Sequence, residues 1–460
     1  MDVTTIVLNK DHQPKLTSLV EVIEAEGGTA GGSGPSQVRS QKLLLECGLV
    51  RPTGSGLFTL LPLARRVINK LEALVIRCIE EAGAQRMSLP SLTAARLWER
   101  TGRLQDVGAE LLKVEDRHGK KYILSPTHEE AVADLLADVG PLSYKQLPLL
   151  LYQIGNKYRD EPRPKHGLLR SREFSMLDAY GAHPSPECAR ETYERVTNAY
   201  RKLFQTLELP IYRVAAPSGT MGGSLSHEWQ LLADAGEDTL ELCPECNSAM
   251  RSEEDSSKKC ARCASETQLV NSIEVGHTFV LGARYSEPLR AHYAAVDAAS
   301  TPLHMSCYGI GITRLLAASV EALANDKALR WPEAIAPYRV LIIGPKEGSK
   351  EWAVHGWEEV QGLGEELERE AGLHSDVVLD DRHTHTIGRR MKAADRMGYP
   401  IIVVCGRSTT EQPPRYELYR SKRVGYSAPE LLTRSELLVT IATMAKVDVN
   451  GEAVCAADSS

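Results

Sequence analysis

Five Arg or Lys side chains fall within residues 159–172, although the chain of 460 residues carries a formal net charge of -7. The planar guanidinium of Arg donates paired, charge-assisted hydrogen bonds to phosphate and carboxylate groups. A concentration of Arg on one loop therefore favours the binding of an anion. Gly167 would let the loop backbone approach such a ligand, and Phe174 would offer a flat face to an aromatic base. Taken alone, the same residues also fit a solvated basic hairpin with Phe174 in the core.

The ten cysteines include two CxxC pairs that are separated by thirteen residues, Cys243 with Cys246 and Cys260 with Cys263. This spacing is typical of a tetrahedral Cys₄ zinc site, in which four thiolates leave no open position for a substrate. We therefore expect a structural Zn²⁺ and not a catalytic one. Four reduced cysteines without a metal, or a redox pair, are the alternatives.

Length and composition narrow the class of protein. A chain of 460 residues is too long for one ordinary core, so two or three domains are expected. Its 42% apolar and 25% charged residues are typical of a soluble globular enzyme, and no apolar run is long enough to span a bilayer. We expect no membrane partner. The acidic balance argues against a protein that coats nucleic acid through general charge, but it allows local basic patches.

Hydrophobic periodicity predicts the elements that position these residues. Apolar residues on one face of 63–82 predict a helix that stops at Gly83. Residues 149–158 and 173–180 flank the basic loop and predict two strands joined by a long turn. Further along, strands and helices alternate as in a separate small α/β domain, over 339–344, 350–371, 376–380, 387–397 and 400–406.

The same patterns predict the domain organisation. A tract rich in Gly and Ser ends the segment 1–36, which we expect to be flexible. Its first fifteen residues contain acidic side chains and no Arg, so they make a poor transit peptide. A change of character near 331–337 separates a first domain, 37–332, from a second, 333–460. Polar sequence around the cysteines marks 240–270 as an insert in the first domain.

The basic loop and two other stretches resemble the motifs of the class II aminoacyl-tRNA synthetases. Arg159 to Glu161, then Arg170, Phe174 and Asp178, resemble motif 2. The string GIGITR at 309–314 resembles motif 3, and 63–90 resembles motif 1, the dimer-forming element. Further strings, at 55–63, 125–130, 221–229, 274–287 and 307–314, together resemble the prolyl-tRNA synthetases. The similarity runs from about residue 38 to the C-terminal region.

This resemblance implies a fold and an activity. The fold would be an α+β catalytic domain with the antiparallel class II synthetase sheet, followed by a C-terminal α/β anticodon-binding domain. The activity would be the ATP- and Mg²⁺-dependent activation of L-proline to prolyl-adenylate and its transfer to tRNA(Pro), by a homodimer. The chain lacks the editing insertion of many bacterial relatives, and in this respect it is most like the short mitochondrial form. The implied location is the mitochondrial matrix, with the bacterial cytoplasm as the alternative. A catalytically inactive paralogue that binds tRNA or a partner protein is the alternative function.

The resemblance also assigns roles in the ATP site. Arg159 would bridge the substrate carboxylate and the α-phosphate, and it is a catalytic residue together with Arg314. Arg170 and Arg314 would clamp the β- and γ-phosphates. Phe174 and Arg314 would enclose the adenine, whose amino group would donate to Glu161.

In the proline site, Thr127 and Glu129 would hold the secondary ammonium, and Arg159 the carboxylate. The pocket for the pyrrolidine ring would be lined by Glu228, His277, Phe279 and Cys307. Without the resemblance, His277 and Cys307 would be interpreted as a hydrogen-bonded core histidine and a buried apolar cysteine.

Two groups of basic residues are expected to contact tRNA. Lys165 and His166, at the tip of the basic loop, would face its acceptor end. Residues 380–425 hold ten Arg or Lys against five Asp or Glu, a local surplus that favours contact with phosphates. The candidates there are Arg382, Arg389, Arg390 and Lys392. An ordinary charged surface is the alternative for any one of them.

Overall fold

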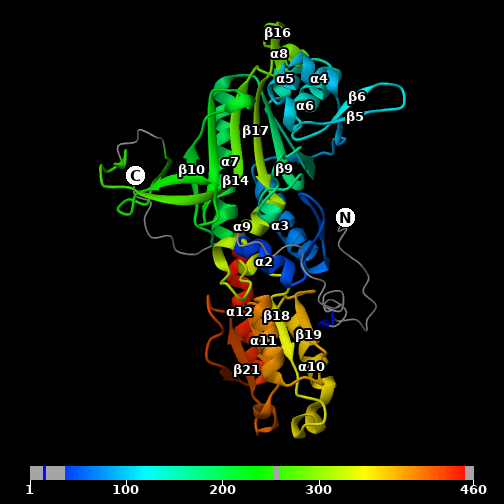
Figure 1. Ribbon diagram of the computed structural model, residues 1–460, viewed down its shortest axis with the longest axis vertical. Helices are drawn as coiled ribbons and strands as arrows, with labels where there is room; N and C mark the ends of the chain where they lie inside the picture. The colour runs from blue at the N-terminus through cyan, green and yellow to red at the C-terminus, as the bar shows by residue number, and fades with distance from the viewer. Residues whose placement is uncertain (1–13, 17–36, 253–257, 451–460) are drawn as a thin grey trace. The chain divides into compact units, whose positions relative to one another are not determined.

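The computed structural model describes residues 14–16, 37–252 and 258–450 (Figure 1). Except for 14–16, the segment expected to be flexible lies outside the described residues. The chain divides into two compact units. The larger unit contains Pro52–Thr59 and Ile68–Ala322, and the smaller unit contains the described parts of Met1–Arg51, Leu60–Val67 and Leu323–Ser460.

The larger unit is built on a nine-stranded sheet with the order β10-β11-β14-β17-β9-β8-β3, to which β12 and β13 add beside β14 (Figure 1). All of its strand pairs are antiparallel except β3 with β8. The antiparallel sheet predicted from the sequence is therefore confirmed. The strands are β3 (Gln85–Arg86), β8 (Leu149–Tyr158), β9 (Glu173–His183), β10 (Ile211–Ala215), β11 (Leu225–Leu232), β12 (Asp238–Leu242), β13 (Ala249–Arg251), β14 (Gln268–Gly282) and β17 (His304–Gly311).

The strands β8 and β9 are the pair expected on either side of the basic loop. They are paired from Leu149 opposite Ala182 to Tyr158 opposite Glu173. The loop between them is closed by a hydrogen bond from the Arg159 N–H to the Arg172 carbonyl, 2.9 Å long. It contains a short 3₁₀ turn at Gly167–Leu169. The loop thus leaves and re-enters the sheet at one point, with Arg159 fixed at its first position.

Helices cover this sheet and extend the unit. α7 (Pro186–Thr206) packs against β9, β14 and β17. It begins where Ser185 accepts a hydrogen bond from the N–H of Cys188, with Pro186 in the first turn, as helix N-termini favour. The predicted helix at 63–82 is α3 (Pro62–Glu81), which ends before Gly83 at φ +89°. The others are α4 (Ala95–Arg100), α5 (Arg103–Asp106), α6 (Glu129–Asp138), α8 (Ser286–Leu289) and α9 (Ile312–Leu323).

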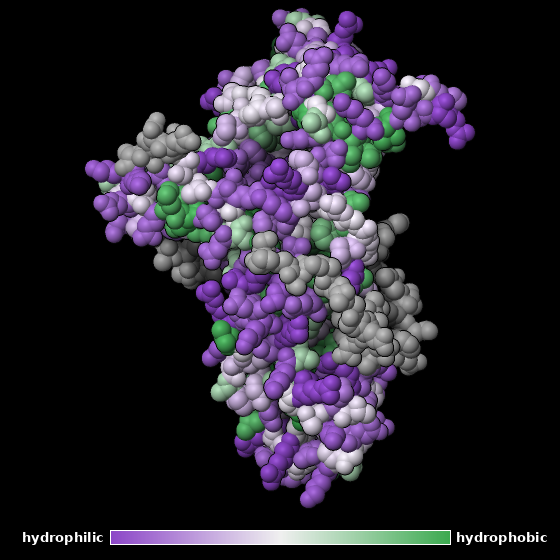
Figure 2. All heavy atoms as spheres, viewed as in Figure 1, coloured by the Kyte–Doolittle hydropathy of each residue, from purple (hydrophilic) through white to green (hydrophobic). Residues whose placement is uncertain are grey.

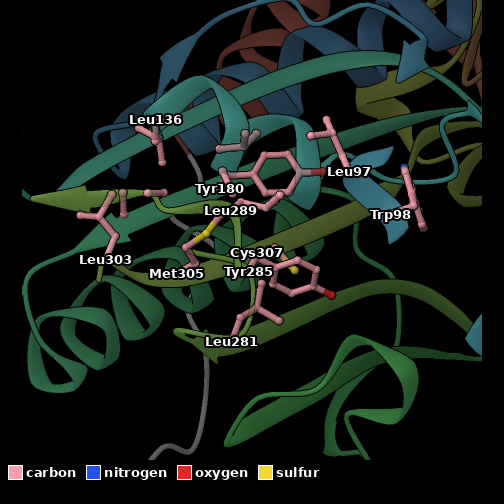
Figure 3. Packing of buried hydrophobic residues seen from close by; sticks show 14 of the residues in the cluster. Leu97, Trp98, Leu136, Tyr180, Leu281, Tyr285, Leu289, Leu303, Met305 and Cys307 are labelled. Atoms are coloured by element: carbon pink, nitrogen blue, oxygen red, sulfur yellow. The ribbon is translucent and has the colours of Figure 1, made fainter. Parts of the chain in front are cut away.

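Smaller sheets and a hydrophobic cluster complete the larger unit. One sheet has the order β4-β6-β5 and another β16-β15-β7. The cluster includes Tyr180, Tyr285 and Cys307, and in the view of Figure 3 Tyr285 is seen next to Cys307 and below Tyr180. This cluster supports the sheet where β9, β14 and β17 carry the candidate site. The remaining strands are β1 (Val50–Gly54), β2 (Leu57–Leu60), β4 (Leu92–Ala94), β5 (Leu112–Glu115), β6 (Lys121–Leu124), β7 (Leu142–Ser143), β15 (His292–Ala294) and β16 (Ser300–Pro302).

The smaller unit contains a five-stranded sheet of order β19-β18-β20-β21-β22, in which β19, β18 and β20 are parallel. The alternation of strands and helices predicted for 339–406 is therefore confirmed. Because parallel strands are buried on both faces, β18, β19 and β20 are wholly buried. The elements are α2 (Arg39–Glu46), β18 (Val340–Ile343), α10 (Lys350–Glu370), β19 (Val377–Asp380), α11 (Ile387–Met397), β20 (Ile401–Val404), β21 (Tyr416–Arg420), β22 (Glu430–Leu432) and α12 (Arg434–Asn450).

The face seen in Figure 2 is mostly hydrophilic, with hydrophobic residues gathered beside the β5–β6 hairpin. In that small sheet Leu92 pairs with Leu124, which also pairs with Leu112, so the three side chains share one face. Leu92 is 45% exposed there. Among the described residues, no helix has the length and apolar character needed to cross a membrane.

Candidate active site

A cavity of about 360 Å³ opens in the larger unit, over the surface of β9, β14 and β17. Strands, helix starts and loops that are far apart in the sequence contribute its walls. Most of the residues that the sequence assigned to one site line it together: Thr127, Glu129, Arg159, Phe174, His277, Phe279, Cys307 and Arg314. Glu161, Arg170 and Glu228 are not among the lining residues.

Two guanidinium groups form one end of the cavity. Arg159 lies 5.2 Å from the centre of the Phe174 ring. Within the described ranges it makes no ion pair, and burial together with the charge of Arg314 lowers its pKa. Arg314 donates to the carbonyls of Leu169 and Glu274, at 3.0 and 3.1 Å. The nearest carboxylate is Glu274, 3.9 Å from Arg314, and one carboxylate beside two neighbouring cations leaves a positive charge that favours an anionic ligand.

The chain positions these cations at the ends of strands. Arg159 directly follows β8, and Arg314 lies in the first turn of α9, directly after β17. Between them the sheet surface carries glycines, including Gly276 and Gly309. A Cβ at Gly276 would lie 3.0 Å from the Gly309 carbonyl oxygen, so a side chain there would strain the strand pair. The bare backbone leaves room for a ligand between the two Arg residues.

Acidic groups form the other end of the cavity. Glu129 and Glu130 begin α6 and are 1% and 0% exposed. One buried cation, Arg103, serves both: its Nη1 lies 3.0 Å from Glu130 and 3.5 Å from Glu129. One buried guanidinium between two buried carboxylates leaves an excess of negative charge. Since buried charges are stable only when they are paired, this end of the cavity favours a cation.

A hydrogen-bond network fixes Glu129 in place. The Thr127 hydroxyl donates to Glu129 at 2.6 Å, and it lies 3.4 Å from the Tyr180 hydroxyl. Tyr180 donates to Asp178 at 2.8 Å, and Asp178 forms a buried ion pair of 2.6 Å with Lys157. Burial raises the pKa of Asp178, but hydrogen bonding to His128 and the charge of Lys157 outweigh it, so the pKa is lowered. Asp178 is therefore an ionised support for Tyr180.

The wall between the two ends is apolar and aromatic. His277 and Phe279 are stacked, with ring centres 3.9 Å apart. Both nitrogens of His277 are occupied, at 2.7 Å from the Ser226 hydroxyl and 3.0 Å from Glu274. Burial and Glu129 raise the pKa of Cys307 well above its usual range, so Cys307 is a neutral, apolar part of the wall.

Glu274 joins this wall to the cationic end. Burial works to raise its pKa, but the hydrogen bond to His277 and the charges of Arg314 and Arg159 lower it to about 2. It is therefore ionised at neutral pH. Glu274 was not among the predicted site residues, although its position three residues before His277 offered a signal. Arg103 and Tyr180 were also missed, and nothing in the surrounding sequence marks them as site residues.

The outer cations of the basic loop form a separate group around Glu237. Arg170 lies 2.9 Å from Glu161 and 2.7 Å from Glu237. Lys165 lies 2.6 Å from Glu237, and His166 lies 3.8 Å from it. Of the loop residues assigned to ATP and tRNA, only Arg159 lines the cavity. The roles of the others stay predictions.

The four cysteines come together in two similar turns. Their sulfur atoms all lie within 4.8 Å of one another, with 3.4 Å between Cys243 and Cys263 and 3.5 Å between Cys246 and Cys260. In each turn the first Cys N–H donates to the carbonyl five residues on, at 2.9 Å for Cys243 and 2.8 Å for Cys260. Hydrogen bonds from Ser248 and from backbone N–H groups lower the pKa of Cys260 to about 6. The arrangement suits a tetrahedral thiolate site.

The basic candidates of the smaller unit have different surroundings. Arg390 is 0% exposed and donates to the carbonyls of Gly344 and Asp380, which lie at the ends of two parallel strands. It supports the sheet and is not available to contact RNA directly. Arg382 forms a two-point ion pair with Asp380, at 2.8 and 3.0 Å. Arg389 and Lys392 are exposed on α11.

The fold and the cavity define a class II aminoacyl-tRNA synthetase. The family model of the class II tRNA synthetase core domain (G, H, P, S and T) matches residues 112–323, and the model of the anticodon-binding domain matches residues 330–420. The solved prolyl-tRNA synthetase of Cryptosporidium parvum, complexed with halofuginone and AMPPNP, has the same fold, with a TM-score of 0.72. Its sequence is 16% identical, and the match covers 89% of this chain and 76% of that one.

More specifically, the chain belongs to the family of proline–tRNA ligases. It is 44% identical to the probable mitochondrial proline–tRNA ligase of Homo sapiens, over 83% of this chain and 80% of the human one. The corresponding protein of Schizosaccharomyces pombe is 38% identical, over 81% and 87%. A bacterial relative, the proline–tRNA ligase of Wolbachia from Brugia malayi, is 34% identical, over 82% and 89%.

Proposed function

We propose that the chain activates L-proline with ATP, releases pyrophosphate, and transfers the prolyl group to tRNA(Pro). The observation that carries this proposal is the charge pattern of the cavity. Excess negative charge at Glu129 and Glu130 lies at one end, and Arg159, which has no ion pair among the residues that the structure describes, lies at the other. A zwitterionic amino acid fits between them, with its ammonium toward the carboxylates and its carboxylate toward Arg159. The apolar wall of Phe279 and Cys307 suits a pyrrolidine ring.

In the activation step, a carboxylate oxygen of proline attacks the α-phosphorus of ATP. The new bond joins this oxygen to phosphorus, and the bond to the bridging oxygen breaks, so that pyrophosphate leaves with the electron pair. Arg159 would donate to both the carboxylate and the α-phosphate, which holds them in line and offsets their repulsion. In the transfer step, a terminal hydroxyl of tRNA attacks the carbonyl carbon and AMP leaves. No protein nucleophile is required.

For the rest of ATP we retain the roles implied by the family motifs. Phe174 and Arg314, which both line the cavity, would enclose the adenine. Arg170 would bind the phosphates, and Glu161 would accept from the adenine amino group. Both roles require that the present ion pairs of Arg170 with Glu161 and Glu237 first break. Arg170 is 41% exposed at its side chain, so exchanging Glu237 for a phosphate costs little.

Mg²⁺ fits residues beside the cationic end. Ligand atoms of Glu228, Glu274 and His277 lie within 4.8 Å of one another. Mg²⁺ prefers oxygen ligands, usually one or two carboxylates plus substrate phosphates. Glu228 already forms a close ion pair with Arg251, at 2.6 Å, whereas Glu274 lies 3.9 Å from Arg314, so Glu274 is the carboxylate that would hold the ion. When bound, Mg²⁺ neutralises part of the phosphate charge.

The partners follow from the two domains. We propose residues 37–332 as the catalytic domain and 333–460 as the anticodon-binding domain that contacts tRNA, with Arg389 and Lys392 exposed toward phosphates.

We also propose a homodimer. Leu92, just after the motif 1 resemblance, shares an apolar face with Leu112 and Leu124, and a second copy of the chain would cover it.

We further propose one structural Zn²⁺ per chain, held by the four cysteines. Elemental analysis of the purified protein should find zinc at a 1:1 ratio to the chain. Cys260→Ser should lower this ratio strongly, because three thiolates close the tetrahedral site poorly. Cys405→Ser, which alters a buried cysteine of the smaller unit, is the control and should keep the zinc. Purified wild-type protein without zinc would overturn the assignment and favour four reduced cysteines.

For location, we propose the mitochondrial matrix, with the bacterial cytoplasm as the alternative. The support is that relatives from Homo sapiens and Schizosaccharomyces pombe carry the name of mitochondrial proline–tRNA ligases. Bacterial relatives are also similar over most of the chain.

ATP–pyrophosphate exchange with each of the twenty amino acids tests the proposed reaction. We expect exchange that depends on proline, with weaker exchange for alanine. A pocket rejects a ligand that lacks one methylene group by only about 10–200-fold, so alanine, which is two carbons smaller than proline, should be activated weakly. Exchange driven best by another amino acid would refute the substrate. A protein that gave no exchange with any of them would instead be the catalytically inactive paralogue.

A further inference from the structure

The cysteine site is joined to the active site through one side chain. The turn with Cys243 and Cys246 connects β12 to β13, whose last residue is Arg251. Arg251 does not belong to any of the synthetase motifs. Its Nη1 lies 2.7 and 2.6 Å from the two carboxylate oxygens of Glu228. Its other terminal nitrogen lies 3.9 Å from Asp238. A residue of the insert thus contacts an active-site strand, β11.

Glu228 needs the charge of Arg251 because its own carboxylate is buried. It is 6% exposed and accepts one further hydrogen bond, from Gln230 at 2.9 Å. Burial and the neighbouring charge of Glu274 raise its pKa. Without Arg251, two carboxylates whose oxygen atoms lie within 4.8 Å of each other, Glu228 and Glu274, would remain beside the position proposed for Mg²⁺ and the phosphates that it binds. That excess of negative charge would weaken the binding of a polyphosphate.

Among the described strands, β13, which carries Arg251, pairs only with β12, and it also contacts β10. β13 pairs with β12 through three residues, from Leu240 opposite Arg251 to Leu242 opposite Ala249. A hydrogen bond of 2.7 Å from Tyr212 to Asn247 ties the turn to β10. A metal bound by the four cysteines would lock the turn and therefore the start of β13.

We infer that the cysteine-bound metal holds Arg251 against Glu228, so that Arg251 is a positioning residue for the ATP side of the active site. The metal-filled insert is then coupled to catalysis although none of its four cysteines lines the cavity. This inference rests on the proposed ligase function. The affinity for ATP, and not the affinity for proline, then depends on the insert.

The first experiment measures KM for ATP and for proline in pyrophosphate exchange. Arg251→Gln should raise KM for ATP about 10-fold, a usual size for coupled sites, and leave KM for proline nearly unchanged. Arg251→Lys should recover part of the loss, because it restores the charge without the two-point contact. In the double variant Arg251→Gln with Glu228→Gln, KM for ATP should return toward the wild-type value, since the unpaired charge is gone. Arg262→Gln, an exposed cation of the other cysteine turn, is the matched control and should behave like the wild type.

The second experiment removes the metal with a zinc chelator and repeats the measurement. KM for ATP of the wild type should rise to the value of Arg251→Gln, and re-adding Zn²⁺ should reverse the change. In Arg251→Gln itself, chelation should add almost nothing. Additive effects of chelation and substitution would overturn the coupling, and so would an Arg251→Gln protein with wild-type KM for ATP. A wild-type protein without proline-dependent exchange would instead refute the proposed function.

Discussion

Arg159→Ala should lower the rate of proline-dependent pyrophosphate exchange by about 10³-fold, the loss seen when a preorganised donor to the transition state is removed. Arg159 lies 5.2 Å from the centre of the Phe174 ring, is repelled by the charge of Arg314, and has no ion pair within the described part of the chain. Its removal therefore breaks no protein contact that the fold needs. It also relieves the repulsion between two cations, so the free energy of unfolding should not fall. The loss should appear in kcat as well as in KM, because Arg159 serves the transition state.

Arg163→Ala provides the matched control. Arg163 lies in the same loop, carries the same charge and is exposed. Its exchange rate should stay within about 3-fold of the wild type, as surface substitutions are usually tolerated. Light scattering should give the mass of a dimer for the wild type and for both variants. Near wild-type exchange in folded Arg159→Ala protein would refute the role of this residue.

The fold was largely predictable because it depends on local pattern. The apolar face of α3, the strands on both sides of the basic loop and the βαβ alternation of the smaller unit each follow from spacing within a short window. Their bounds agree with the structure to within a few residues: the helix predicted over 63–82 runs from Pro62 to Glu81, and β9 extends past residue 180 to His183.

It was less predictable which of the charged residues line the cavity and which form ion pairs elsewhere. Arg159 and Arg170 have the same chemistry on the same loop, yet only Arg159 lines the cavity. Arg170 turns to Glu237, which is 67 residues away in the sequence, and such a pair has no local signal. Arg390 was interpreted as part of a basic patch, because sequence alone does not show that the carbonyls of Gly344 and Asp380 need a donor. Long-range pairing therefore limits what residue type and spacing can assign.

Glu129→Gln should raise KM for proline about 100-fold and leave KM for ATP nearly unchanged. The reason is charge and not shape, since Gln has the same size. With Glu129 neutral, Arg103 and Glu130 balance each other, and the buried end of the cavity loses its excess negative charge. The side-chain amide of the introduced glutamine would also point N–H donors at the N–H donors of the prolinium, and two donors cannot form a hydrogen bond. Removing one partner of a buried, hydrogen-bonded charge pair costs about 2–5 kcal/mol, and about 100-fold lies within that range.

Two comparisons separate this effect from a loss of folding. Glu99→Gln removes an exposed carboxylate from the neighbouring helix α4 and should leave both KM values unchanged. Glu130→Gln should also weaken proline binding, because Arg103 would then neutralise Glu129. It should in addition lower the melting temperature, since Glu130 accepts from both Arg103 and Thr101. Glu129→Gln should melt close to the wild type, because the Arg103–Glu130 pair stays intact. If Glu129→Gln bound proline normally, excess negative charge would not be what recognises the ammonium group.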